Sequence, residues 1–301
     1  MALFGKKKPK VNREGLEVVM AATAFAIARL KALDIDADVK PGTAGFETQL
    51  VDTEGREYEL TDLFSRVRAL PAAAINPIVV EYIDALVDAM GGPSSSELTD
   101  EQLLERIRVR LQPEAIAQEP GFSYARPVAR GLVAVLCIDH PATIEYVNDD
   151  FLVGRNVVQL FNAGFVNVMA EPIEHTSQPV ANVTRIMGDL FTATKALGMS
   201  QLIGTVLPAA PHGVLFTVPH RQVLYAHAVS GPLTVQAIDD LGVLLRANIG
   251  EDAPGGPLGT FIYYWRDSVI DVVAGFNAEG TLQVDGSGRF GTRLQELIAG
   301  Q

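Results

Sequence analysis

The sequence predicts an α+β fold, in which an N-terminal helix-hairpin-helix layer precedes a larger, mostly antiparallel sheet with helices packed on it. Three observations lead to this prediction. Helix-forming segments flank a hairpin pattern over the first 92 residues, and strand-like segments dominate after Phe122. The last three strand candidates, at 260–265, 269–274 and 281–284, are joined by short turns, which favour an antiparallel meander over crossover helices.

The composition is that of a folded globular protein. The chain has 301 residues, of which 48% are hydrophobic and 20% are charged, close to ordinary globular usage. Its apolar runs fall far short of the roughly 18 to 20 residues that cross a bilayer, and its N-terminus lacks the apolar core of a signal peptide. We therefore expect a cytoplasmic protein without a transmembrane segment.

Charge and cysteine content exclude several kinds of site and partner. The formal net charge is −12, and an acidic surface repels phosphate backbones, so we expect no nucleic-acid partner. The chain has one cysteine, Cys137, inside an apolar strand, which excludes an internal disulfide and a cysteine-based zinc site. We interpret Cys137 as a small core residue.

Residues 1–11 form a basic tail that we expect to be flexible. Its lysines follow an apolar start and are Lys6, Lys7, Lys8 and Lys10. Such a cluster can touch anionic lipid or an acidic partner. One Leu-Phe pair beside the lysines gives only marginal membrane affinity, so a solvated tail is the plainer interpretation.

Residues 12–92 are predicted to form an N-terminal α+β subdomain. Asn12 can cap a long helix with one broad apolar face. Alternating segments at 46–51 and 56–60 surround an Asp-Thr-Glu-Gly turn and predict a hairpin. Two further helices complete this layer.

The boundaries of these two helices follow from capping residues. Thr61 is predicted to cap the first, and Asn76 before Pro77 predicts the start of the second. Gly91 and Gly92 end the second helix.

Residues 93–98 are predicted to be a linker to a strand-rich α+β domain at 99–301. Thr99 and Gln102 have the spacing of a capping box and predict a helix start. The predicted strands are 128–138, 144–147, 213–218, 223–229, 260–265, 269–274 and 281–284, and the predicted helices are 157–170, 189–197, 233–247 and 292–299.

Short motifs lie at 60–65 with the helix at 77–90, at the strand pair 127–147, at the helix end 165–168, at the strand end 264–267 and, faintly, at 234–245. In these segments and in its order of elements, the chain resembles a bacterial family of unknown function, the YtpQ-like family, also called domain of unknown function 1444. Asp62 and Phe64 stand where the family has an amide and a tyrosine. The resemblance implies an α+β cytoplasmic bacterial protein and brings no catalytic residues.

Two strand ends carry ionisable residues and are the candidate ligand sites. The apolar strand 132–138 stops at Asp139 and His140, where a carboxylate could orient a general base or the residues could form a turn. The aromatic strand 261–265 ends in Arg266 and Asp267. There, Tyr264 and the arginine could hold an anion, or the two charges could form a structural ion pair.

Other patterns predict ordinary structure. The spacings of His212, His220 and His227 fit no standard metal motif, so we expect no metal site. The glycine-rich segment 286–291 matches a dinucleotide-binding pattern, but no second strand follows it to complete the βαβ unit. We expect a turn before a C-terminal helix and no cofactor.

The leading functional hypothesis is a non-enzymatic binding or accessory module with a protein partner or a second copy of itself. The alternative is a small-molecule enzyme or sensor that binds an anionic ligand at the strand ends carrying Asp139, His140 and Arg266. Peripheral membrane attachment through the lysines of the tail is a third hypothesis.

Overall fold

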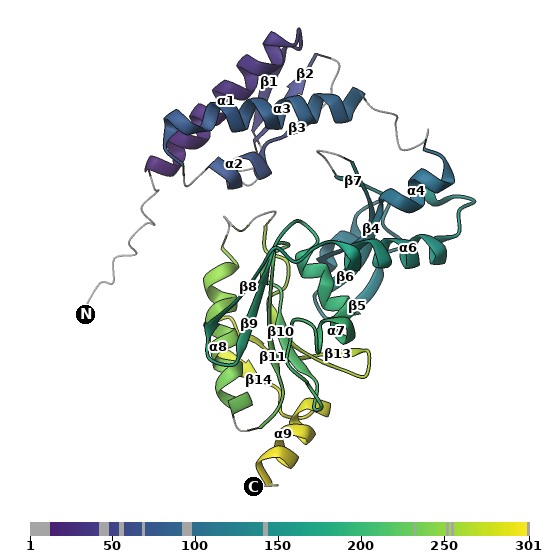
Figure 1. Cartoon of the computed structure of the whole chain (residues 1–301), viewed down its shortest axis with the longest axis vertical. Helices are drawn as coiled ribbons and strands as arrows, with labels where there is room; N and C mark the ends of the chain where they lie inside the picture. The colour runs from purple at the N-terminus through teal and green to yellow at the C-terminus, as the bar shows by residue number, and fades with distance from the viewer. Residues whose placement is uncertain are drawn as a thin grey trace. The chain divides into compact units, whose positions relative to one another are not determined.

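The computed structural model describes most of the chain in two units that both combine helices with antiparallel sheets (Figure 1). The units are Met1–Gly92 and Pro93–Gln301. The described residues are 13–41, 48–53, 57–67, 70–91, 98–140, 144–231, 233–250, 253 and 256–299. These elements confirm the predicted α+β fold.

The helices of the described ranges include no candidate membrane span. None of them is long and apolar enough to cross a bilayer.

The first unit contains a three-stranded antiparallel sheet. Its elements are α1 (Arg13–Ala32), β1 (Ala37–Pro41), β2 (Thr48–Asp52), β3 (Glu57–Glu59), α2 (Thr61–Val67), η1 (Ala72–Ala74) and α3 (Ile75–Gly91). The predicted hairpin is confirmed as β2 and β3, and β1 is a strand that the sequence did not predict. Arg29 ties α1 to α3, since its Nε and Nη2 donate to Asp84 at 2.5 and 2.8 Å.

Three helix starts of this unit were predicted from capping residues, and α2 begins at Thr61 itself rather than after it. Asn12 lies outside the described residues. Asn76 is the second residue of α3 rather than its N-cap, because the 3-10 turn η1 leads into the helix at Ile75.

The second unit contains two antiparallel sheets. Its elements are α4 (Asp100–Arg106), β4 (Ile107–Pro113), η3 (Glu114–Gln118), β5 (Arg126–Ala129), β6 (Leu132–Asp139), β7 (Ile144–Tyr146), α5 (Asp149–Leu152), α6 (Val157–Ala170), β8 (His175–Val180), β9 (Val183–Met187), η4 (Thr192–Gly198), α7 (Met199–Leu202), β10 (Val214–Thr217), β11 (Val223–Ala228), α8 (Leu233–Asn248), β12 (Phe261–Arg266), β13 (Val269–Phe276), β14 (Leu282–Val284) and α9 (Arg289–Ala299).

The seven-stranded sheet has the order β14-β13-β12-β10-β11-β9-β8. Apolar residues of α8 and α9 pack on one face of it, around Tyr264 and Ile262. Residues of η4 and α7 pack on the other face, around Phe216 and Tyr263. Both faces are therefore buried in the middle of the sheet, which explains why its central strands are almost entirely apolar.

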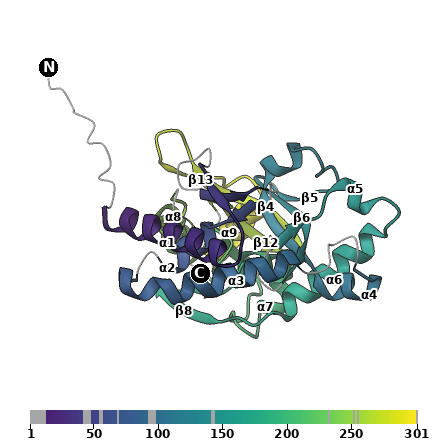
Figure 2. The ribbon, with the colours of Figure 1, turned by 90° about the horizontal axis from the view of Figure 1, so that it is seen from above.

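The four-stranded sheet has the order β4-β6-β5, and β7 pairs with the second half of β6. Helices α4 and α6 pack on one face of it (Figure 2). The approach is close at Gly164 of α6, where an added Cβ would lie 2.8 Å from the Val109 backbone nitrogen. Only a residue without a side chain fits this crossing.

Several predicted elements of the second unit are confirmed. Thr99 and Gln102 form both hydrogen bonds of the capping box, α6 has the predicted bounds, and β12 to β14 form the predicted meander. Asp267 and Ser268 form the turn between β12 and β13, with φ of 51° and 62°.

Other predictions for this unit were wrong. The segment predicted as one strand at 128–138 is a hairpin of β5 and β6, because Gly131 adopts a left-handed φ of 85° that ends the first strand. The helix predicted at 189–197 is the 3-10 helix η4. The sequence analysis missed β4, β8 and β9.

Candidate functional site

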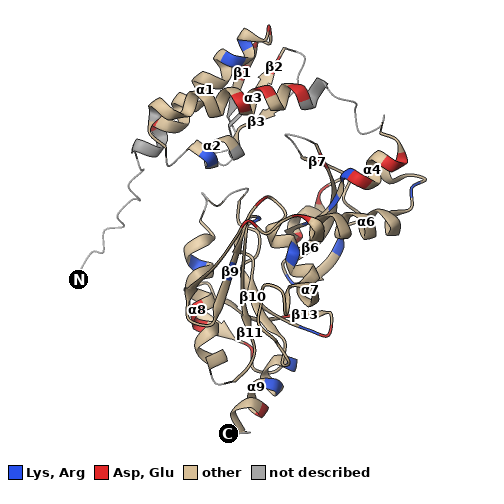
Figure 3. Cartoon of the chain, in the orientation of Figure 1, with Lys and Arg blue, Asp and Glu red and all other residues tan. Residues whose placement is uncertain are grey.

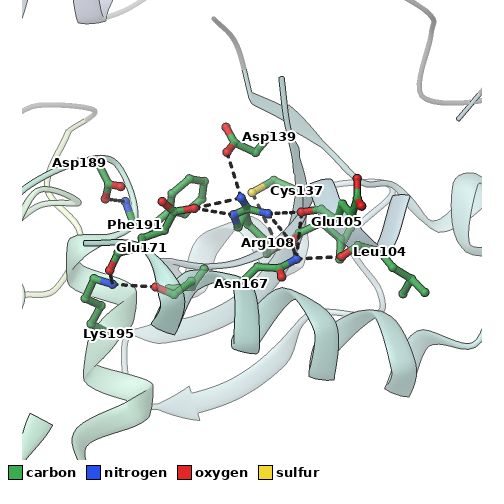
Figure 4. Close-up of polar contacts among 12 residues, drawn as sticks. Leu104, Glu105, Arg108, Cys137, Asp139, Asn167, Glu171, Asp189, Phe191 and Lys195 are labelled. Carbon is green, nitrogen blue, oxygen red and sulfur yellow. Dashed lines mark hydrogen bonds and ion pairs between the residues drawn. The ribbon is translucent and has the colours of Figure 1, made fainter. Parts of the chain in front are cut away.

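Asp139, at the end of β6, lies in a cluster of charged side chains centred on Arg108 (Figure 4). Arg108 Nη2 is 3.5 Å from Asp139 Oδ2 and 2.9 Å from Glu171 Oε1, and its Nε donates to the same Glu171 oxygen at 3.0 Å. Its Nη1 donates to the Glu105 carbonyl at 2.7 Å. The Arg108 side chain is only 14% exposed, so this guanidinium is nearly saturated with acceptors inside the fold.

Lys195 lies beside this cluster and is 1% exposed (Figure 4). Its Nζ donates to the carbonyl oxygens of Val168 and Glu171, both at 2.7 Å, at the C-terminal end of α6. Burial lowers the pKa of Lys195, and the nearby carboxylates of Asp189 and Glu171 oppose this effect. A cation at a helix C-terminus compensates unpaired carbonyls, so Lys195 holds α6 against η4.

Asn167 fastens the same end of α6 to β4. Its Nδ2 donates to the carbonyl oxygens of Leu104 and Ile107 at 2.8 and 2.9 Å. Thr194 of η4 accepts a hydrogen bond from the Leu111 backbone N–H at 3.0 Å. These contacts give the charged cluster a structural role, because they join α6, β4 and η4, which are distant in the sequence.

Cys137 is a core residue and shows no activation as a nucleophile. It is fully buried, and its thiol contacts the Arg108 carbonyl oxygen at 3.7 Å. Burial raises the pKa of Cys137 to about 12, so the thiol stays protonated at neutral pH.

Asp139 and His140 point to different partners. Asp139 lies near Arg108, whereas His140 Nε2 is 3.1 Å from Glu145 Oε2 on β7. The described contacts do not include the orientation of His140 by Asp139 that a general-base pair needs.

Arg266 and Asp267 pair with each other, whereas Tyr264 has a different partner. Arg266 Nε is 3.3 Å from Asp267 Oδ2, and the Asp267 side chain is 82% exposed. Tyr264 is buried, and its hydroxyl donates to the His212 carbonyl at 2.5 Å. These residues belong to the seven-stranded sheet and Asp139 to the four-stranded one, and no contact among the described residues joins the two strand ends.

The remaining candidates have ordinary structural surroundings. His227 Nδ1 lies 2.7 Å from the Asn182 carbonyl oxygen and its Nε2 lies 3.1 Å from Thr234 Oγ1, and burial lowers its pKa. Burial also lowers the pKa of His220, to about 4. Within the described ranges, no three His, Cys, Asp or Glu side chains form a group that could hold a metal ion. The four tail lysines lie outside the described residues.

A groove of about 500 Å³ lies along β12, β13 and β14. It is lined by Arg130 of the β5–β6 turn, Phe261, and residues 272–276 and 283–285. The Phe261 ring lies close to two glycines, since an added Cβ would approach it to 2.6 Å at Gly275 and 3.1 Å at Gly131. The Arg130 guanidinium carbon lies 5.2 Å from the centre of this ring, in the range of a cation–π contact.

The sequence analysis missed Arg108, Glu171, Lys195 and Arg130. A signal for Arg108 was present, since residues 107–112 alternate between aliphatic and polar side chains as a strand does. Glu171 and Lys195 carry no such signal, because their roles arise only when α6 meets β4 and η4.

Replacing Asp139 with Asn is expected to change how stability depends on pH. Burial raises the folded-state pKa of Asp139 above its ordinary 3.8, although Arg108 opposes this. The native carboxyl therefore binds its proton more tightly than the unfolded one. Its contribution to stability is present below the unfolded pKa and is lost as the pH rises through the folded pKa.

Urea unfolding at several pH values measures this effect as the free energy of unfolding of Asp139→Asn minus that of the native chain. We expect this difference to increase, in favour of the variant, between about pH 4 and pH 7. Asp267→Asn, at an exposed turn, is the control. A difference that stays constant across this range contradicts the assignment.

Comparison of this chain with protein-family models, curated proteins and solved structures finds no match.

Proposed function

We propose that this protein is a non-enzymatic, cytoplasmic binding module that holds an extended protein segment in the groove beside β14. The observation that carries the proposal is Arg130 over the Phe261 ring of β12, in the groove that extends from β12 to the edge strand β14. The lining of the groove is aliphatic, aromatic and amide, with one arginine and the carboxylate of Asp285. It offers surface for binding and contains no serine, cysteine, histidine or lysine for covalent catalysis.

The strand next to the groove favours an extended partner. β14 is at the end of the strand order, and its Val284 side chain is 49% exposed. An edge strand offers backbone N–H and C=O groups to a further strand, and such pairing gives affinity while side-chain pockets give specificity.

Charge indicates which segment fits. No carboxylate among the described residues forms an ion pair with Arg130, whose side chain is exposed. A guanidinium held over an aromatic ring binds carboxylates through its remaining N–H donors. We therefore expect a segment in which a carboxylate follows an apolar side chain, the apolar group resting on Phe261.

Selection of displayed heptapeptides on the full chain tests this proposal. We expect enrichment of apolar-acidic sequences, and at least a tenfold loss of their affinity in Arg130→Glu, about 1.4 kcal/mol. Arg266→Glu changes a half-buried arginine at the opposite end of β12 from Phe261 and is expected to keep the affinity. Selected peptides that bind Arg130→Glu as well as the native chain contradict the proposal.

The other hypotheses stay predictions. Membership in the YtpQ-like family rests on the segments quoted above and adds no activity. Membrane contact through the tail rests on lysines that lie outside the described residues. An anionic ligand bound jointly by Asp139, His140 and Arg266 has no supporting contact among the described residues.

A further inference from the structure

One face of the four-stranded sheet carries the polar residues of β4. Arg108, Arg110 and Gln112 alternate along this strand, so they project from the same face. Cys137 of β6 lies directly opposite Arg108, and Tyr146 of β7 lies directly opposite Cys137, which places both on this face as well. Figure 3 shows blue segments, which mark Lys and Arg, around β4.

Arg110 is buried on this face without a counter-charge. The residue is 5% exposed, and its Nε is fully enclosed and has no hydrogen-bond partner. Its guanidinium carbon lies 5.3 Å from the centre of the Tyr146 ring. In the part of the chain that the structure describes, no carboxylate pairs with Arg110 and no acceptor meets its Nη atoms. The two Nη atoms of the Arg110 guanidinium are not among the enclosed atoms, so they remain accessible to a ligand.

The neighbours of Arg110 do not supply the missing charge. Asp139 and Glu171 are both engaged by Arg108. Cys137 is close enough for Arg110 to oppose the rise of its pKa, but that pKa is still about 12, so no thiolate forms at neutral pH. The Gln112 amide is neutral and donates its Nε2 hydrogen to the Tyr146 hydroxyl at 2.6 Å.

A buried arginine cannot avoid the free-energy cost of burying its charge by losing its proton. Arginine remains protonated in proteins, so the guanidinium stays charged when it is buried. A buried charge without a partner is destabilising, and proteins pair such charges with an acid or an ion. The same strand illustrates this rule, since Arg108 has two carboxylates within 3.5 Å.

We propose that Arg110 is the cationic anchor of a binding site for a small oxyanion, a free inorganic anion or the phosphate or carboxylate group of a metabolite. The planar fork presents paired N–H donors that match two oxygens of such a group, and the Tyr146 ring fixes its orientation. This anion site is separate from the groove at β14, and it does not depend on whether that groove binds a peptide.

Calorimetric titration with inorganic phosphate and with sulfate, at constant ionic strength set by chloride, tests the proposal. We expect saturable binding by the native chain and a Kd at least tenfold weaker in Arg110→Met. Thermal unfolding provides a second readout. The melting temperature of the native chain is expected to rise with phosphate by ligand linkage, and that of Arg110→Met is not.

Arg126→Met is the matched control. Arg126 also lies on this sheet with its guanidinium carbon over an aromatic ring, 3.6 Å from the centre of Phe161. We expect it to keep the phosphate response. If Arg110→Met does not fold, Arg110→Lys replaces it, since this variant keeps the charge but loses the fork and is expected to bind phosphate several-fold more weakly.

Two results overturn the proposal. One is a native chain that responds to phosphate and sulfate no more than to chloride. The other is an Arg110 variant that binds phosphate as tightly as the native chain does. A glucose phosphate and a dicarboxylate, titrated in parallel, distinguish the metabolite source from the inorganic one, because a metabolite site binds one of them more tightly than it binds inorganic phosphate.

Discussion

Gly164→Ala is expected to destabilise the protein by about 2 to 3 kcal/mol, although the same change inside a helix ordinarily stabilises by up to about 1 kcal/mol. The new methyl group would lie 2.8 Å from the Val109 nitrogen and 2.9 Å from the Arg108 carbonyl carbon. Both atoms belong to the backbone of β4, which is held by its ladder with β6. The methyl therefore forces α6 away from the sheet, and urea unfolding of the variant measures the cost.

Gly242→Ala is the matched control for this prediction. Gly242 is also buried inside a helix, α8, and an added Cβ would approach Leu282 Cδ2 to 2.7 Å. That atom is the end of a flexible side chain, which can rotate away at little cost. We expect its stability to stay within about 0.5 kcal/mol of the native chain or to rise. Equal losses in the free energy of unfolding of both variants would show that Gly164 is not needed for the close packing of α6 on the sheet.

The contrast between Gly164 and Thr99 shows what the sequence could predict. The capping box of α4 involves residues three apart, so its two hydrogen bonds depend only on local spacing. The β12–β14 meander also follows from short turns. The need for glycine at 164 depends on β4, a strand more than fifty residues earlier in the chain, and no local pattern contains that information.

The missed strands have physical reasons of their own. β8 is exposed along most of its length and has the polar sequence His-Thr-Ser-Gln-Pro-Val, so no apolar alternation marks it. β4 does alternate, but its polar positions include Arg110, which is buried rather than solvated. A strand with charges on a covered face departs from the polar-out pattern by which half-buried strands are found.

The candidate site was predicted only in part for a related reason. The sequence placed Asp139 at the end of a buried strand, and the structure agrees. Its partner Arg108 is 31 positions earlier in the sequence numbering, and Glu171 follows only after α6. Ion pairs of this kind form when tertiary packing brings elements together, so composition and spacing do not show which charges will be matched.

Arg108→Met is expected to destabilise the protein by about 3 kcal/mol, because it leaves carboxylates in a partly enclosed site without their cation. Methionine fills much of the arginine stem, so the loss reports on charge and hydrogen bonds rather than on a cavity. The variant loses the Arg108 hydrogen bond to Glu171 and the one to the Glu105 carbonyl oxygen. It also loses the ion pair of Arg108 with Asp139. Urea unfolding at neutral pH measures the change.

A double-mutant cycle with Glu171→Gln separates the ion pair from other effects of Arg108→Met. If the Glu171 carboxylate is the main group left uncompensated, the second substitution restores part of the stability, with a coupling energy of about 1 kcal/mol or more. Arg266→Met breaks an ion pair whose carboxylate is 82% exposed and is expected to cost less than about 1 kcal/mol. Strictly additive losses in the cycle would contradict the pairing of Arg108 with Glu171, and would assign the cost to the carbonyl contacts of α4 instead. In that case Arg108 acts as a cap on the helix end rather than as the centre of the charged cluster.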